Sequence, residues 1–215
     1  MRSIFLVPAG NAALFDEALD SGVQAVAIDV TKGAASDAAP MLKFLRERGR
    51  RSLARIHALT SGFADSDLDA VMAHAPYGII LPQACGGRDV QHLGAKLAVR
   101  EAENGLEDGS TRILAAAADL PEAIFALGSL AGATRRLLGL LWDGAALAGA
   151  LGVGEDADIL AVARAQLVFA AAAAGAPALV DAAASPDFSR ARRDGFGGAV
   201  VANRAAAEAC ERIFA

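Results

Sequence analysis

Polar side chains that can bind anions or transfer protons follow several short apolar runs in this sequence. Arg55 and His57 end one run, Asp29 follows another, and Gln83 follows a third. A guanidinium offers a planar, bidentate fork to a carboxylate, and a histidine titrates near neutral pH. Carboxylates move protons or hold hard cations. Where such groups converge, they suit the binding of a small anionic substrate such as a carboxylate.

The apolar runs have the composition of buried strands. The clearest, Tyr77–Gln83, is short, rich in branched residues and closed by a proline and a polar side chain. A run of this length without polar alternation is typical of a strand buried on both faces, as in parallel sheets. The strands expected on this basis are Arg2–Ala9, Val23–Val30, Arg51–His57, Tyr77–Pro82, Arg112–Ala118, Leu137–Trp142, Ala178–Asp181 and Ala199–Ala202.

Helical patterns separate these runs. Asn11 is a candidate N-cap for the first helix and Gly22 a C-terminal stop, whereas residues Thr31 to Ala39 are expected to form a loop. Pro121 sits where a helix begins, so its missing N–H costs little. The first helix is expected around Leu14–Leu19, and the others at Met41–Arg50, Asp67–His74, Arg88–Glu103, Pro121–Ala131, Ala145–Leu151, Asp158–Ala174, Asp187–Arg193 and Ala205–Phe214.

This alternation predicts an α/β fold, a single (β/α)₈ TIM barrel formed by residues 1–215 as one domain. Closure into a barrel removes both exposed sheet edges. The alternative is an open, doubly wound sheet, but Ala9-Gly10-Asn11 after the first strand is a single-glycine turn and lacks the glycine-rich phosphate fingerprint.

In such a barrel, function resides at the carboxyl ends of the strands. The side chains expected to meet there are Asn11, Asp29, Thr31, Lys32, Arg55, His57, Gln83, Cys85, Asp119, Asp143, Asp181, Asn203 and Arg204.

The overall composition argues against several classes of protein. The 215 residues are 54% hydrophobic and 21% charged, with a formal net charge of -5. An acidic chain is a poor binder of nucleic acid or of anionic membranes. The longest apolar stretch, Ile159–Ala174, is interrupted by Arg164 and is too short to span a bilayer. Cys85 and Cys210 have no metal-ligand spacing and imply no structural disulfide. A cytoplasmic location is the simplest interpretation.

Several motifs, in order along the whole chain, resemble the citrate lyase beta-subunit-like proteins of the HpcH/HpaI aldolase superfamily. They are Arg2-Ser3-Ile4-Phe5-Leu6-Val7-Pro8-Ala9-Gly10-Asn11, Ser21-Gly22-Val23-Gln24-Ala25-Val26-Ala27-Ile28-Asp29, Ala54-Arg55-Ile56-His57, Gly78-Ile79-Ile80-Leu81-Pro82-Gln83 and Gly195-Phe196-Gly197-Gly198. The resemblance implies a barrel that is usually oligomeric. It also implies Mg²⁺-assisted cleavage or formation of a C–C bond next to a carboxylate or thioester, often on acyl-CoA substrates.

Within that resemblance, Arg55 matches the arginine that binds the substrate carboxylate; the alternative is a strand-end ion pair. Asp29 matches the first acid of an Asp-Leu-Glu-Asp stretch, with Thr31 and Lys32 in place of the later acids. A structural hydrogen-bonding role for Asp29 is the alternative to a catalytic one. His57 stands where the family has asparagine, and it is either a general acid or base or a hydrogen-bonded wall residue.

The resemblance breaks down at the metal ligands. Ala118 and Ala146 align with the glutamate and aspartate that hold Mg²⁺ in the family, and Gln83 replaces a lysine. Asp119 and Asp143 lie close by in the sequence, and a small change of register would make them a displaced metal site. The alternative for both is helix N-capping.

Two functions therefore stay open. One is a lyase or aldolase that acts on a small carboxylate or acyl-CoA, with Arg55, Asp29 and His57 as catalytic candidates and Gln83 and Asn11 as further substrate-binding candidates. The other is a catalytically degenerate homologue, a pseudoenzyme that binds a carboxylate or supports a partner subunit. A homo-oligomer is expected from the resemblance.

Overall fold

The structure is a computed structural model that describes residues 1–181 and 187–215. The strands in this part of the chain are β1 Ser3–Pro8, β2 Ala25–Asp29, β3 Arg51–Arg55, β4 Gly78–Leu81, β5 Arg112–Ala116, β6 Leu137–Trp142, β7 Ala178–Asp181 and β8 Gly198–Val201.

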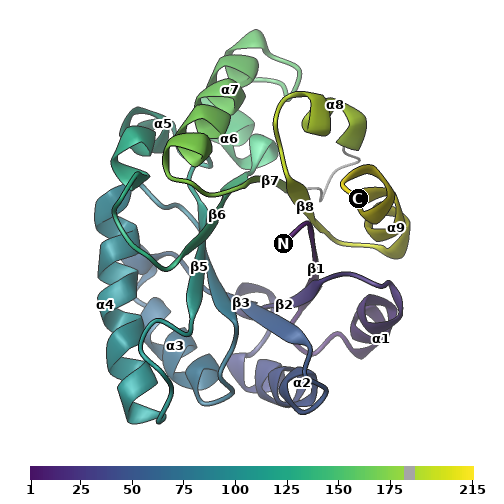
Figure 1. The fold of residues 1–215 in the computed structure, drawn as a ribbon, viewed down its shortest axis with the longest axis vertical. Helices are drawn as coiled ribbons and strands as arrows, with labels where there is room; N and C mark the ends of the chain where they lie inside the picture. Colours follow the sequence, from purple (N-terminus) through teal and green to yellow (C-terminus); the bar gives the residue numbers. More distant parts are fainter. Residues whose placement is uncertain (182–186) are drawn as a thin grey trace.

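These strands form a closed parallel barrel in sequence order (Figure 1). The ring closes because β8 pairs with β1, where Ala199 lies opposite Ser3 and Val201 opposite Phe5. Closure satisfies the backbone groups that an open sheet would leave at its edges. The predicted (β/α)₈ TIM barrel is therefore confirmed, and the doubly wound sheet is excluded.

Helices surround the barrel and cover its outer face (Figure 1). They are α1 Ala12–Asp20, α2 Ala35–Glu47, α3 Ala64–Met72, α4 Gly87–Glu103, α5 Pro121–Ala126, α6 Gly144–Leu151, α7 Asp158–Ala173, α8 Phe188–Arg193 and α9 Arg204–Ile213, with short 3₁₀ helices at Val30–Lys32, Leu59–Ser61 and Leu127–Leu130. No helix in the described ranges has the length and apolar character needed to cross a bilayer.

The strands separate two apolar cores, because successive side chains point to opposite faces. One core fills the barrel interior and includes Leu53, Leu141 and Leu179. The other lies between strands and helices and includes Ala54 and Ile56 of the β3 segment. Side chains that continue the interior alternation past the end of a strand therefore project into the mouth of the barrel.

The predicted loop from Thr31 to Ala39 is wrong. A 3₁₀ turn follows β2 at once, and α2 begins at Ala35, five residues before Pro40. Proline lacks the N–H for an intrahelical bond and usually marks a helix start. Here the buried Ala38, Met41 and Leu42 anchor the segment in spite of that loss.

Several predicted strand ends extend too far. β3 stops at Arg55 instead of His57, and β5 stops at Ala116 instead of Ala118. His57, Ala117 and Ala118 therefore lie in the segments that follow these strands, at the carboxyl end of the barrel. β6 and β7 have the predicted bounds.

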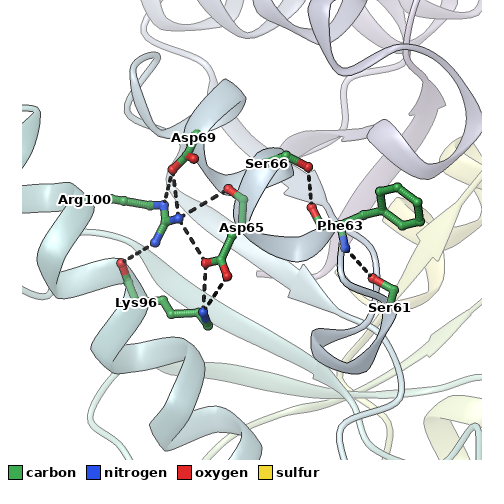
Figure 2. Close-up of polar contacts among 7 residues, drawn as sticks. All are labelled: Ser61, Phe63, Asp65, Ser66, Asp69, Lys96 and Arg100. Carbon is green, nitrogen blue, oxygen red and sulfur yellow. Dashed lines mark hydrogen bonds and ion pairs between the residues drawn. The ribbon is translucent and has the colours of Figure 1, made fainter.

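Ion pairs link α3 to α4 on the outside of the barrel (Figure 2). Lys96 Nζ lies 2.8 Å from both carboxylate oxygens of Asp65, and Arg100 contacts Asp65 and Asp69. The hydrogen bond from Lys96 lowers the pKa of Asp65 below its usual value. Because the two carboxylates are exposed, each pair stabilises the fold by no more than about 1 kcal/mol.

Candidate active site

Four charged side chains share the interior alternation of their strands and meet at the mouth. Each stands two residues beyond an interior core residue: Asp29 after Ala27, Arg55 after Leu53, Asp143 after Leu141 and Asp181 after Leu179. On the interior alternation, the mouth therefore contains three carboxylates, those of Asp29, Asp143 and Asp181, and the guanidinium of Arg55.

Arg55 spans the mouth toward the far side of the ring. Its Nη1 lies 3.8 Å from Oδ2 of Asp181, and β3 and β7 are four strands apart in the closed ring, which makes them opposite. Within the described residues, the Arg55 guanidinium donates no hydrogen bond. Its side chain is 21% exposed, so its donors remain accessible to an incoming carboxylate.

Asp29 is the neighbour of Arg55 in the β2–β3 pairing. Its Oδ1 accepts hydrogen bonds from the backbone N–H of Thr31 at 3.0 Å and from the Thr31 hydroxyl at 2.6 Å. This contact caps the 3₁₀ turn, so Asp29 has the structural role that the sequence left as an alternative. Its Oδ2 is buried and lacks a hydrogen-bond partner in the described part of the chain.

Asp119 supports the turn after β4. Its Oδ2 accepts the backbone N–H of Gln83 at 2.8 Å, and Gln83 adopts a left-handed conformation with φ of 54°. Asp119 does not cap α5, because the N-cap residue is Leu120 and no side chain makes the capping bond. The N-cap alternative for Asp119 is therefore wrong. The Gln83 side chain is exposed, in the turn that follows β4.

Burial raises the pKa of Asp119 above its ordinary value, and the nearby charge of Asp143 adds to that rise. The Gln83 amide and the charge of Arg55 act in the opposite direction but do not cancel it. Asp119 Oδ1 is buried without a hydrogen-bond partner among the described residues.

Asp143 caps α6, which confirms the helix N-cap that the sequence offered as the alternative to a metal ligand. Its Oδ1 accepts the backbone N–H of Ala146 at 2.9 Å. Such a cap stabilises a helix by about 1 kcal/mol and leaves the second carboxylate oxygen unused.

The residues present fit a magnesium ion that has few protein ligands. Over residues 1–181 and 187–215, no cluster of three or more His, Cys, Asp or Glu side chains forms a cage for a metal. Mg²⁺, however, commonly takes one or two carboxylates and completes its octahedron with water and substrate oxygens. The unpartnered Oδ1 of Asp119 beside the charge of Asp143 meets that smaller requirement.

His57 forms a pair with Asp67, a residue that sequence reasoning did not assign to the site. His57 Nδ1 lies 2.8 Å from Asp67 Oδ2, which also accepts the His57 backbone N–H at 2.8 Å. Asp67 is buried in α3, and the Phe63 ring packs on the histidine at 5.4 Å between centroids. Nothing in the sequence pattern marks Asp67 except its position in the first turn of the predicted helix.

Two other candidates take local structural positions. Asn11 is exposed and caps α1 by accepting the backbone N–H of Leu14 at 3.1 Å, as predicted.

Burial raises the pKa of the Cys85 thiol, and the charges of Asp89 and Glu122 add to that rise. A thiol that resists ionisation is a poor nucleophile, so Cys85 is not a catalytic candidate.

A pocket of about 310 Å³ adjoins the mouth between β6, β7 and the helices outside them. Sequence reasoning missed Arg164 of α7, which lies 3.2 Å from Asp194 and stacks on the Phe196 ring. The walls of this pocket include Trp142, Asp143, Arg164, Val180, Asp181 and Arg190. Asp143 and Asp181 line this pocket and also stand at the mouth, so the pocket is next to the mouth.

Comparison with solved structures identifies the same fold in several proteins. RipC from Yersinia pestis gives a TM-score of 0.79 at 23% identity, covering 100% of this chain and 95% of that one. A citrate lyase beta subunit from M. tuberculosis, solved with oxaloacetate and magnesium, gives 0.72 at 20% identity, covering 99% and 96%. The Haloferax volcanii malate synthase, solved with pyruvate and acetyl-CoA, gives 0.83 at 14% identity, covering 99% and 69%.

A search of curated proteins returns no match. A model of the HpcH/HpaI aldolase/citrate lyase family, in contrast, matches residues 2–195, which is nearly the whole chain. The match agrees with the motifs noted in the sequence and with the closed barrel. The chain therefore belongs to the HpcH/HpaI aldolase/citrate lyase family.

Proposed function

We propose that this protein is a carbon–carbon lyase or aldolase that acts on a small carboxylate or on its CoA thioester. The observation that carries the proposal is the Arg55 guanidinium, which stands at the carboxyl end of β3 with its hydrogen-bond donors unused by the described residues. The family supports this class of reaction. Two proteins of the same fold were solved with oxaloacetate and magnesium, and with pyruvate and acetyl-CoA.

In this proposal, Arg55 binds and orients the substrate carboxylate. Two parallel N–H···O bonds fix the plane of the carboxylate, which a lysine could not do. The apolar layer of Leu53, Leu141 and Leu179 beneath the mouth excludes water from below. The exposed side chains of Gln83 and Asn11, which follow β4 and β1, are the proposed donors of hydrogen bonds to other substrate oxygens.

Charge balance at the mouth favours a cation. On the interior alternation, Asp29, Asp143 and Asp181 outnumber the Arg55 guanidinium, and the carboxylate of Asp119 lies near Arg55 and Asp143, so a cation would offset this negative charge when an anionic substrate binds. Asp119 and Asp143 are the residues that would hold Mg²⁺. The chemistry that such an ion supplies when bound is the stabilisation of negative charge on a substrate oxygen beside the C–C bond.

His57 is the proposed proton carrier. Asp67 Oδ2 accepts a hydrogen bond from Nδ1 of His57, which orients the imidazole ring. Nε2 of His57 is then the nitrogen that takes or gives a proton. His57 continues the alternation of Leu53 and Arg55 just beyond the end of β3, at the same end of the barrel.

The test is an assay of C–C cleavage with malyl-, citramalyl- and citryl-CoA, with and without Mg²⁺. Arg55→Ala should lower kcat/KM by about 10- to 100-fold, because a charge-assisted hydrogen bond contributes roughly 1.5–3 kcal/mol. Arg51→Ala is the matched control. Arg51 stands at the opposite end of β3 and stacks on Tyr77, so its loss should leave turnover unchanged. Equal effects of the two substitutions would contradict the proposed role of Arg55.

A second candidate function is a carboxylate binder without turnover, acting alone or as the support of a partner subunit. It is favoured by Ala118 and Ala146, which stand where the family resemblance would place the glutamate and aspartate that hold Mg²⁺. A binder would gain thermal stability from carboxylate ligands while cleaving none of the three thioesters.

We also propose that the protein is a cytoplasmic homo-oligomer. Ile159, Val162 and Phe169 recur on one face of α7, and each of these side chains is more than half exposed, with Phe169 at 72%. Phe125 of the adjacent α5 is 93% exposed. A face with this much exposed apolar surface suits contact with a second copy.

A further inference from the structure

The ion pair across the mouth joins the proposed substrate arginine to an acid of the protein itself. We propose that Asp181 is a specificity-determining residue that competes with small monocarboxylates for the Arg55 guanidinium. The inference rests on the proposed function, because it takes Arg55 as the carboxylate-binding group. The carboxylate of Asp181 already faces the Arg55 guanidinium. Its negative charge therefore weakens the binding of any ligand whose only interaction with Arg55 is through a carboxylate.

The geometry places Asp181 where a ligand carboxylate would bind. It follows Leu179 on the interior alternation, at the end of the strand opposite β3. Its side chain is only 7% exposed, and that of Arg55 is 21% exposed, so both groups are held away from bulk water. Water therefore screens their charges less than it would on an open surface.

The distance between Arg55 and Asp181 indicates that Asp181 repels an incoming carboxylate without occupying the hydrogen-bond donors of Arg55. The 3.8 Å between Arg55 Nη1 and Asp181 Oδ2 exceeds hydrogen-bond length, so an incoming carboxylate can take the guanidinium donors without breaking a bond. The negative charge of Asp181 nevertheless stays within a few ångströms of the new anion. At that range, and in a partly buried setting, repulsion between like charges lowers affinity about tenfold or more.

The experiment is a calorimetric titration with pyruvate in the presence of EDTA, so that metal binding does not contribute. Asp181→Asn keeps the size of the side chain and removes its charge. Its Kd for pyruvate should be about tenfold lower than that of the unmodified protein. Asp181→Glu keeps the charge and should give no gain in affinity.

Glu155→Gln is the matched control, because it removes the same charge from an exposed position on the neighbouring pocket. It should change the Kd by less than about twofold, since exposed charges are screened by salt. If Asp181→Asn does not fold, as judged by circular dichroism and thermal unfolding, Asp181→Ser provides the same neutralisation with a smaller side chain.

The outcomes separate the inference from the function on which it rests. Equal or weaker pyruvate binding by the neutral Asp181 variants, with binding still abolished in Arg55→Ala, would overturn the competition and leave the carboxylate site intact. A similar gain in Glu155→Gln would also overturn it, because the effect would then be one of general charge. Pyruvate binding that survives in Arg55→Ala, or that is absent from every variant, would overturn the carboxylate site and the inference together.

Discussion

At the scale of single residues, the chemistry of the mouth depends on how each polar atom is already used. Asp29 uses one oxygen to accept a hydrogen bond from Thr31, and Asp119 uses one to accept the amide of Gln83. Among the described residues, Arg55 has only a long ion pair with Asp181. The capacity for binding therefore lies in the Arg55 donors and in the second oxygens of the acids.

The His57–Asp67 contact leads to a prediction about the histidine tautomer. An ionised carboxylate only accepts hydrogen bonds, so the 2.8 Å contact requires the proton of neutral His57 to be on Nδ1. Nitrogen NMR at about pH 8, above the ordinary histidine range, should show a protonated Nδ1 and a bare Nε2.

Asp67→Asn is the informative variant for that measurement, because an amide can also donate and so relaxes the preference for one tautomer. A histidine that is protonated at Nε2 in the unmodified protein would contradict the proposed proton carrier.

The identities of the mouth residues were predictable from the sequence, but their partners were not. Polar residues at the ends of apolar runs indicated Arg55, Asp119 and Asp143 correctly as mouth residues. The contacts of Arg55 with Asp181 and of His57 with Asp67 depend on the diameter of the barrel and on the seating of α3. No short-range pattern contains that information.

At the scale of elements, the barrel is held together near its amino-terminal end by a buried ion pair. Arg136, just before β6, makes a bidentate contact with Glu101 of α4 at 2.7 and 2.8 Å. Glu101 also accepts the backbone N–H groups of Thr111 and Gly109. Burial would raise the pKa of Glu101, but the bonds from Arg136 and from these amides outweigh it and lower the pKa below its usual 4.5.

Glu101→Gln should destabilise the fold by about 3 kcal/mol, because it removes the buried counter-ion of Arg136 and leaves that guanidinium with the exposed carboxylate of Asp108 at 2.7 Å. Glu103→Gln, on the exposed side of the same helix, should change stability by less than about 0.5 kcal/mol. Urea unfolding of both variants measures the difference. Similar losses in the two variants would show that the buried pair does not stabilise the fold.

The same pair predicts the response to acid. A lowered pKa in the folded state means that the stabilisation is fully present above about 4.5, the unfolded value, and is lost as the pH falls through the folded pKa. Glu101→Gln should therefore lose less stability than the unmodified protein between neutral pH and the acid range. A parallel pH dependence of the two proteins would contradict this assignment.

Strand cores were predictable because parallel strands buried on both faces form continuous apolar runs. The start of α2 was not, because Pro40 resembles a helix start and lies instead inside the helix. The buried face of Ala38, Met41 and Leu42 decides the helix boundary, and that burial exists only once the barrel has formed.

At the scale of the whole molecule, several large apolar side chains are exposed on neighbouring helices of the outer surface. The exposed residues Ile159, Val162 and Phe169 gather on α7, and Phe125 lies on α5, which contacts α7. In the sequence, the apolar stretch Ile159–Ala174 of α7 was recognised as too short to span a bilayer. The spacing alone did not show which of its faces stays exposed.

If this face joins two copies, Phe169→Ser should shift the protein toward the monomer in light scattering at micromolar concentration. Val99→Ser is the control, since Val99 is 56% exposed on α4, away from the proposed interface. A monomer mass for the unmodified protein, or equal effects of the two substitutions, would remove the proposed oligomer.

The most direct test of the account is a crystal structure of the protein soaked with pyruvate and Mg²⁺. Electron density for pyruvate is expected at the carboxyl ends of the strands, with its carboxylate within hydrogen-bond distance of the Arg55 guanidinium. Density for pyruvate elsewhere, or an Arg55 side chain that points away from the barrel mouth, would contradict the carboxylate site on which the proposed function depends.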